Sequence, residues 1–258
     1  MRIAIHTKLH YHFERPTDIL LQLEAAMIPE QDIEAAHLDI TECEHFARVA
    51  AQDEIGERIW VRTEGTLELD YTSTVDVRRL VSDVATLPAV PPHQLPGETV
   101  QYLLPSRYCP ADQFDHFIDA EFHDLEGGAR IAAMRDYIAG NFTYTLGSSH
   151  SGTTALETFV RREGVCRDYA HVLITLARAA AIPARMASVY APRVDPPDFH
   201  AVAEVFLGGA WHLVDPTGMA TEGEMAKIGV GRDAADIAFM TAYGFADLKY
   251  KDVTVTEV

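Results

Sequence analysis

The first hundred residues carry the alternation of apolar and polar positions that is typical of half-buried strands. Over residues 3–13, one face carries Ile3, Ile5, Thr7, Leu9, Tyr11 and Phe13, and the other carries Ala4, His6, Lys8, His10 and His12. Shorter alternating stretches follow near residues 19–27, 44–50, 57–63 and 65–77. No amphipathic helix interrupts them, so the pattern predicts an antiparallel β unit.

A proline-rich stretch follows this unit. Residues 87–97 contain four prolines in eleven positions, which makes a stiff connector with few donors for a β ladder. We therefore predict a β-rich N-terminal domain over residues 1–95 and a second domain over residues 100–258.

The second domain begins with helical patterns and continues with strands. Helices are predicted over residues 126–140 and over residues 153–163, the latter capped by Thr153 or Thr154. A third begins at Cys166 and is apolar on nearly every side, which indicates a central buried helix. Strands are predicted at residues 185–191, 201–207 and 210–214, and near 248–256. The predicted fold class is α+β.

Composition and charge narrow the possible partners. The 258 residues are 48% hydrophobic, enough for a substantial core, and 39 acidic against 21 basic residues give a net charge of −18. The acidic excess argues against nucleic acid and suits a basic or neutral substrate, the alternative being that it only keeps the protein soluble. No run of 18 apolar residues occurs, and the first residues form a strand pattern and not a signal peptide. We expect a cytoplasmic protein with no membrane partner.

The three cysteines are not equivalent, and one of them is a candidate nucleophile. Cys43, Cys109 and Cys166 cannot form a disulfide framework, and no pair has the spacing of a zinc site. Free thiols fit a reducing cytoplasm. Cys166 lies where the chain enters the central helix, and the positive end of a helix dipole stabilises the nucleophilic thiolate. This placement predicts an enzyme with a cysteine nucleophile.

Such a nucleophile needs a base, and the base needs an orienting partner. His171 is the histidine nearest to Cys166 in the sequence, but five helical residues rotate it about 140° away from the thiol. Gly208-Gly209 lies between two alternating runs and predicts a two-residue hairpin turn.

That turn determines which side chains of the hairpin share a face. It sets Val202 opposite Asp215, so His200 and Asp215 are diagonal neighbours about 7–8 Å apart at Cα. The same alternation turns His212 to the opposite face. A three-residue loop would shift the register by one and weaken the arrangement.

Together these residues suggest a nucleophile, a base and an orienting acid. Asp215 would bond one ring nitrogen of His200 and leave the other facing Cys166. The alternative is a buried thiol, a strand-edge histidine and a turn aspartate. The matching order of the three residues, at a helix start and on one hairpin face, favours the catalytic interpretation.

With these residues the chain resembles the bacterial transglutaminase-like cysteine proteases. The resemblance covers residues 104–240 and rests on Gly164-Val-Cys-Arg-Asp-Tyr-Ala-His171, Ile182-Pro-Ala-Arg185, His200-Ala201 with Glu204, Trp211, Asp215-Pro-Thr217 and Gly231-Arg-Asp-Ala-Ala-Asp236. The β-rich start and Leu104-Pro-Ser-Arg-Tyr108 look like the N-terminal region that accompanies this domain in bacteria. The resemblance implies a papain-like α+β core with Cys166, His200 and Asp215 as a triad. It also implies no metal and no organic cofactor.

Two positions depart from the family pattern. Arg167 stands where the family usually has Gln, and Val202 stands where it usually has Trp. We expect both to flank the cleft and to affect substrate preference. The backbone N–H of Cys166 is the default oxyanion donor for this placement, and Tyr144 is a second candidate by loose analogy, the alternative being a core tyrosine.

Two further sequence patterns could indicate a metal site or a phosphate loop, but each has a simpler structural explanation. His6, His10 and His12 could clamp a metal, but a solvated strand face explains them without one. The glycine-rich segment 229–233 lacks the strand-then-helix context of a phosphate loop. By resemblance it is a loop crossing near the active site.

We therefore expect a thiol hydrolase that cleaves peptide or isopeptide amides of a peptide or protein substrate. Cys166 would form the acyl-enzyme, His200 would move the proton and Asp215 would hold His200. The first alternative is a transglutaminase that passes the acyl group to an amine. The second is a non-catalytic binding module that retains the fold. An intact triad argues against the second, and an open cleft at Val202 with a charge at Arg167 would favour water over an amine.

Overall fold

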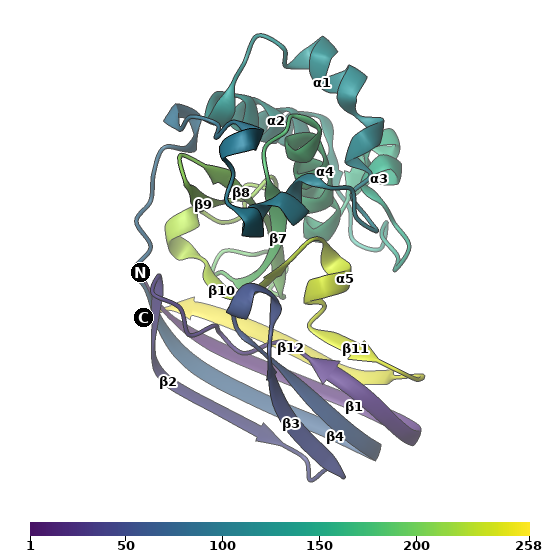
Figure 1. The fold of residues 1–258 in the computed structure, drawn as a ribbon. Coiled ribbons are helices and arrows are strands. Elements are labelled where there is room, and N and C mark those ends of the chain that lie inside the picture. Colours follow the sequence, from purple (N-terminus) through teal and green to yellow (C-terminus); the bar gives the residue numbers. More distant parts are fainter.

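Two antiparallel sheets and a group of helices make up the structure, a computed structural model that describes residues 1–258 (Figure 1). The larger sheet lies at one end of the molecule, and the helices and the smaller sheet lie at the other. The α+β class is therefore confirmed. None of the helices is long and apolar enough to cross a bilayer.

The first sheet is built on two long strands that pair along most of their lengths. Its six strands are β1 (Arg2–Leu21), β2 (Gln31–Ile40), β3 (His45–Ala50), β4 (Glu57–Val77), β11 (Met240–Ala242) and β12 (Asp247–Glu257). β1 and β4 form the centre, with β2 and β3 on the free edge of β4 and β12 and β11 on that of β1. The stretches predicted separately at residues 57–63 and 65–77 are thus one strand.

The sheet is completed by the last residues of the chain. β12 pairs antiparallel with β1 from Ile3 opposite Glu257 to His12 opposite Asp247, and the two termini lie side by side (Figure 1). Residues 240–257, assigned from the sequence to the second domain, therefore lie in the first sheet. Alternation identifies a strand but does not say which partner it pairs with.

The remaining elements form a helical layer against the second sheet. The helices are α1 (Asp115–Glu121), α2 (Gly127–Asn141), α3 (Ala155–Arg161), α4 (Cys166–Ala179) and α5 (Ala234–Ile237). The sheet has the order β10-β7-β8-β9, from β7 (Ala184–Tyr190), β8 (His200–Leu207), β9 (Ala210–Val214) and β10 (Ala226–Gly231). A short parallel pair joins β5 (Thr143–Tyr144) to β6 (Glu163–Gly164).

Short 3-10 turns connect these elements, at Gln52–Glu54, Val84–Thr86, Pro92–Gln94, Gly97–Leu103, Ala111–Gln113 and Glu222–Glu224. The helices predicted from the sequence are present within a few residues. Thr154 caps α3 through a capping box with Glu157. α4 is buried from Asp168 to Arg178 and packs on β7 and β8, as expected of a central helix.

The glycine-rich segment 229–233 is not a loop over its first residues. Gly229 and Gly231 belong to β10, which pairs antiparallel with β7. A Cβ on Gly229 would lie 1.9 Å from Nε2 of Gln22, so glycine lets the two sheets approach each other here. β10 is buried on both faces, and a strand of that kind shows no alternation.

The proline-rich stretch is docked on the helical layer along its first residues. Leu87 O accepts a hydrogen bond from Gly128 N–H at 2.8 Å, and Pro88 O accepts one from Gly208 N–H at 2.9 Å. A Cβ on Gly128 would lie 1.6 Å from Val84 O, so α2 could not approach this closely without glycine. The stretch connects the two halves, but it does not run free between them.

The two sheets share a core. Apolar side chains of β1 and β4 pack with Tyr190 of β7 and Ile228 of β10, and all of these are buried. Tyr190 Oη lies 3.1 Å from Oγ1 of Thr7 and donates to Leu23 O at 2.7 Å. Fully burying one such side chain stabilises a fold by about 1.5–3 kcal/mol.

A buried charge cluster joins the two halves beside this core. Glu204 in β8 accepts hydrogen bonds from Nε of Arg185 at 2.7 Å and from Nζ of Lys227 at 2.6 Å. Arg185 also bonds Asp53, and Lys227 also bonds Glu30, both from the first half of the chain.

Candidate active site

Cys166 is the first residue of α4, half-buried at the helix start. The first turn is closed by the buried carboxylate of Asp168, which accepts hydrogen bonds from Val165 N–H at 3.0 Å and Ser149 Oγ at 2.9 Å. A Cβ on Gly164 would lie 2.8 Å from Cβ of Asp168, so glycine is needed just before the turn. The thiol therefore lies at the positive end of the central helix.

The β8–β9 hairpin has the two-residue turn predicted at Gly208-Gly209. Both glycines have positive φ, 60° and 89°, as a type I′ turn requires. Leu207 pairs with Ala210, and the register continues to Ala203 opposite Val214. It brings His200, at the start of β8, next to Asp215, which directly follows β9.

His200 and Asp215 are hydrogen-bonded with no exposed side-chain surface. Nε2 of His200 donates to Oδ2 of Asp215 over 2.9 Å. Burial alone would lower the pKa of His200, but hydrogen bonds and charge from Asp215 and Cys166 raise it to about 10. The other ring nitrogen, Nδ1, is buried and faces Cys166. It has no other hydrogen-bond partner.

Asp215 is held by donors on both oxygens. Oδ1 accepts from the N–H and the hydroxyl of Thr217 at 2.9 and 2.7 Å, and Oδ2 accepts from Ala220 N–H at 2.9 Å as well as from His200. Burial would raise the pKa of Asp215, but these hydrogen bonds and the charge of His200 lower it. Asp215 is therefore a fixed anion, and the proton lies on Nε2 of His200.

Tyr144 lies beside the thiol at the end of β5. Burial and then the charge of Cys166 raise the pKa of its hydroxyl, while the backbone N–H of Cys166 acts in the opposite direction. Its ring also packs on Tyr169 of α4, with centroids 5.9 Å apart. The structure thus brings together Cys166, His200, Asp215 and Tyr144.

The other histidines of this half point elsewhere. His171 is fully buried, stacks on Tyr108 at 5.0 Å and accepts a hydrogen bond from Ala234 N–H at Nε2. Burial, with help from Arg167 and Arg178, lowers its pKa well below 6.5. His212 lies on the other face of the hairpin, with Nδ1 3.8 Å from Glu222.

Arg167 and Val202, the two residues that depart from the family pattern, differ in their exposure. Arg167 is half-buried and donates to Asp168, to Ser149 Oγ and to His150 O. Val202, expected to flank the cleft, is fully buried among apolar side chains and presents no surface to a substrate. It lies two residues further along β8 than His200, in an apolar cluster that also contains Leu213 and Met225.

Two sets of residues at the site were not found from the sequence. Thr217 and Ala220 hold Asp215, and the order Asp215-Pro-Thr217 is a turn signal from which the Thr217 contact follows. Asp198, two residues before His200, forms an ion pair with Lys251 of β12. Only the long-range pairing of β12 with β1 brings Lys251 there.

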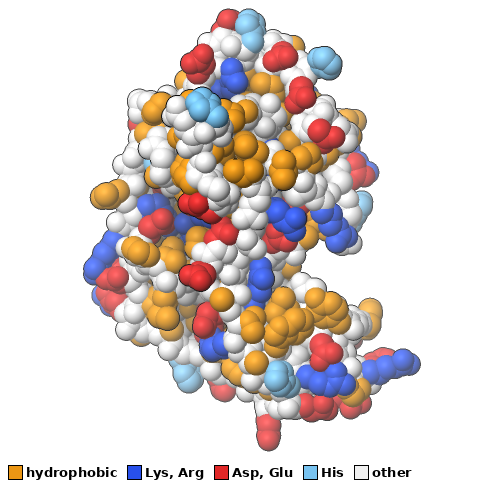
Figure 2. Space-filling view, in the orientation of Figure 1, with side chains coloured by type: hydrophobic (Ala, Val, Ile, Leu, Met, Phe, Trp, Pro, Cys, Tyr) orange, Lys and Arg blue, Asp and Glu red, His pale blue; other side chains and the backbone are white.

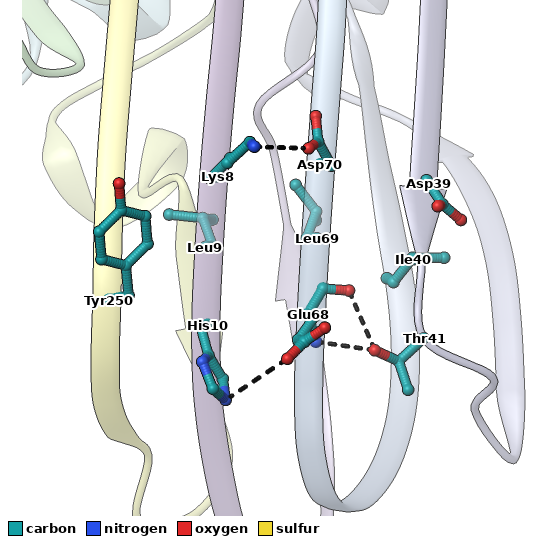
Figure 3. Close-up of a pocket in the computed structure, with 10 residues that line it drawn as sticks. All are labelled: Lys8, Leu9, His10, Asp39, Ile40, Thr41, Glu68, Leu69, Asp70 and Tyr250. Carbon is teal, nitrogen blue, oxygen red and sulfur yellow. Dashed lines mark hydrogen bonds and ion pairs between the residues drawn. The ribbon is translucent and has the colours of Figure 1, made fainter.

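The histidines of β1 pair with carboxylates on the outer face of the first sheet. His6 lies 2.8 Å from Asp70 and His10 lies 3.9 Å from Glu68. A cavity of about 490 Å³ lies here, between Tyr250 of β12 and the end of β2, and Figure 3 shows Lys8 and His10 turned toward β4 across it. No group of three or more His, Cys, Asp or Glu side chains is placed to hold a metal ion.

Comparison with known proteins identifies a family whose model covers the residues of this site. The family model of the transglutaminase-like superfamily matches residues 118–216, which include Cys166, His200 and Asp215. A crystal structure from Cytophaga hutchinsonii, described as a "Putative Cysteine Protease", is 33% identical with a TM-score of 0.92, covering 99% of this chain and 90% of that one. The chain belongs to the transglutaminase-like superfamily.

Two mycobacterial relatives match a shorter region. An uncharacterized protein of Mycobacterium leprae is 35% identical over 125 residues, 43% of this chain and 42% of that protein. An uncharacterized protein of Mycobacterium tuberculosis is 32% identical over 125 residues, 42% of this chain and 40% of that protein. The match thus spans less than half the length of these relatives.

Proposed function

We propose that the protein is a thiol hydrolase that cleaves peptide or isopeptide amides through an acyl-enzyme on Cys166. The observation that carries this proposal is the position of His200, hydrogen-bonded to the ionised Asp215 on one side and facing the Cys166 thiol on the other. A nucleophile, a base and an orienting anion are what acyl transfer through a thioester requires.

The reaction follows from this geometry. Because the pKa of His200 is raised to about 10, its imidazole is protonated at neutral pH. Nδ1 holds the proton that came from the Cys166 thiol while Sγ attacks the amide carbonyl carbon. The tetrahedral intermediate collapses as the C–N bond breaks, and Nδ1 gives the proton to the leaving amine. Water then attacks the thioester, His200 takes a proton from that water, and the carboxylic acid leaves while Sγ regains a proton. Asp215 stays ionised throughout and holds the imidazole.

We propose two donors for the developing oxyanion. The backbone N–H of Cys166 lies at the helix start, and the Tyr144 hydroxyl lies beside the same group. Because the pKa of Tyr144 is raised, the hydroxyl keeps its proton at neutral pH and can donate it. Removing one such donor typically slows a reaction about 10²–10³-fold.

The structural neighbour supports hydrolysis over the alternatives. The Cytophaga hutchinsonii protein, described as a putative cysteine protease, resembles this chain over nearly its whole length. A non-catalytic binding module would have no need of a buried ionised carboxylate with four hydrogen bonds, one of them to His200.

Transfer to an amine remains the second candidate function. The burial of Val202 removes one argument for an open, wet site. However, transfer enzymes need apolar walls beside the cysteine, and neither tryptophan lies there. Trp60 packs against Tyr243 of the first sheet, and Trp211 packs against Tyr102. Water at about 55 M therefore has the advantage over a free amine.

The proposal also includes the substrate class, the partners and the location of the protein. We expect a peptide or protein substrate, no nucleic acid or membrane partner, and action in the cytoplasm. The three free cysteines and the net charge of −18 support these expectations.

The test separates hydrolysis from transfer. The enzyme is incubated with acyl-donor peptides and excess labelled primary amine, and mass spectrometry quantifies free acid against conjugate, with Cys166→Ala as the control. We expect free acid from the wild type and no turnover from Cys166→Ala. A product mixture dominated by conjugate at modest amine concentration would instead support a transglutaminase.

A further inference from the structure

Asp198 places a negative charge two residues before the proposed base. One carboxylate oxygen accepts a hydrogen bond from Phe199 N–H at 2.8 Å, and the other pairs with Nζ of Lys251. The side chain of Asp198 is 39% exposed and that of Lys251 30%, so both charges are accessible to a bound molecule. Neither group takes part in the proposed chemistry.

The first sheet contacts the segment that leads into His200. Lys251 belongs to β12, opposite Leu9 of β1. Its ammonium lies 5.9 Å from the ring centroid of Phe239, and that ring stacks on Phe199 at 4.7 Å with an angle of 11°. An ion pair and an aromatic stack therefore fix the segment leading into His200 against the first sheet.

The charge of Asp198 also affects the pKa of one tyrosine in each half of the molecule. It contributes to the raised pKa of Tyr144, which lies beside Cys166, and to that of Tyr11 in β1. The ion pair with Lys251 places the carboxylate next to the first sheet, in the segment that leads into His200. Figure 2 shows the surface hollowed between the helical half and that sheet, next to α5 and β11 of Figure 1.

A partly exposed carboxylate two residues before the proposed base, where the first sheet borders the segment, fits a positively charged chain end. We propose that Asp198 binds the free α-ammonium of the substrate, so that the enzyme cuts peptides close to their amino termini. This inference rests on the proposed function. A partly exposed ion pair contributes little to stability, so an incoming ammonium can share or displace Lys251 at low cost. The net charge of −18 favours the approach of a cation.

Lys251 is the competing recognition group, because it could bind a substrate carboxylate instead. We favour Asp198 because it precedes His200 by two residues on the same chain segment, whereas Lys251 belongs to the sheet behind it. The two possibilities predict opposite effects of the two single substitutions.

The experiment uses a peptide library in which only the α-amine varies. Proteins are acetylated on lysine before digestion, and half of the resulting peptides are then acetylated at their new amino termini. Cleavage by the full-length enzyme is followed by mass spectrometry. We expect cuts within the first few residues of free-amine peptides and at least about tenfold lower kcat/KM on blocked ones, the size of one lost charged hydrogen bond.

Variants identify the group that recognises the substrate. Asp198→Asn should lower the ratio of kcat/KM on free-amine peptides to that on blocked peptides from at least about tenfold to about one. Lys251→Met should keep the preference. Asp247→Asn, which removes an exposed pair with Lys249 in the same strand, is the matched control and should have no effect. Thermal unfolding of each variant checks that it folds.

The outcomes separate this inference from the proposed function. Equal cleavage of free and blocked peptides would overturn the inference alone. A preference that survives Asp198→Asn and disappears in Lys251→Met would assign recognition to Lys251 and also overturn it. No cleavage of any peptide by the wild type would overturn the proposed function, and this inference with it.

Discussion

Nε2 of His200 and Oδ2 of Asp215 lie 2.9 Å apart, and neither side chain has exposed surface. Three further donors, from Thr217 and Ala220, hold the same carboxylate. The orientation of the imidazole is therefore set by a group that is itself fixed, and Nδ1 is left facing the thiol of Cys166.

The first prediction concerns this pair. His200→Ala should abolish turnover, because no other base faces Cys166. Asp215→Asn should lower kcat by about 10³–10⁴-fold, because an amide can stabilise the wrong tautomer of His200. Initial rates on a cleavable peptide measure both effects.

The control for this prediction is His212→Ala on the opposite face of the hairpin. It should keep activity within about threefold, because its loss leaves the site intact. Loss of all activity in His212→Ala, with His200→Ala active, would mean that the base has been misassigned.

The second prediction concerns the three thiols. Cys109 is fully buried and burial raises its pKa to about 12; burial also raises that of Cys43. Cys166 lies at a helix start beside His200, so it should react first with limiting iodoacetamide at neutral pH. Peptide mapping should show label on Cys166 well before Cys43, and on Cys109 only after denaturation. Equal labelling of all three would remove the case for an activated nucleophile.

The third prediction concerns pH and stability. The pKa of His200 is raised from 6.5 to about 10 in the folded protein, so its protonated form favours folding. That contribution is complete below about pH 6.5 and is lost as pH rises through about 10. The free energy of unfolding of the wild type should therefore exceed that of His200→Gln most at pH 6. We expect this difference to shrink by at least about 2 kcal/mol by pH 10, since a tenfold change in proton affinity is worth about 1.4 kcal/mol. A difference that grows with pH in urea titrations would contradict this.

The fourth prediction concerns the buried charge of Glu204. Burial would raise its pKa, but Lys227 and Arg185 lower it to about 2. Glu204→Gln removes the one fully buried anion that Arg185 and Lys227 share and should destabilise the protein by about 3–5 kcal/mol. Urea unfolding measures this, with Asp32→Asn at the exposed pair with Arg78 as a control that should not shift the midpoint. In the wild type the contribution of Glu204 is present above about pH 4.5 and is lost as pH falls toward 2.

The fifth prediction concerns the connection between the two halves. Residues 88–94 are mostly exposed, so subtilisin should cut there first. The fragments should stay together on size-exclusion chromatography, because β12 of the second fragment pairs with β1 of the first. They should separate only in denaturant. Cuts exclusively between residues 126 and 215 would contradict the two-part organisation.

The parts that local sequence determines were predictable. The β8–β9 hairpin follows from two glycines and the alternation on each side, and these alone place His200 beside Asp215. The start of α4 follows from the apolar run after Cys166. Each of these relationships joins residues close in the sequence, where turn geometry and periodicity decide the outcome.

The parts that long-range packing determines were not predictable. β2 is an exposed edge strand with little apolar contrast, and β10 is buried on both faces, so neither shows a clear alternation. Val202 was expected at the cleft because nothing in the sequence shows that it belongs to a buried cluster with Leu213 and Met225. The pair of Asp198 and Lys251 exists only because the chain returns to its first strand.

That return has a consequence for how the protein folds. β1 pairs with a strand that a ribosome would make more than two hundred residues later, from Ile3 opposite Glu257 onward. Contacts so far apart in sequence carry a high loop-closure entropy, which slows folding. Once the helical half has formed, it brings β11 and β12 close to β1 and shortens the effective loop. We expect the first sheet to fold late, and a newly made chain to leave the edge of β1 unpaired until then.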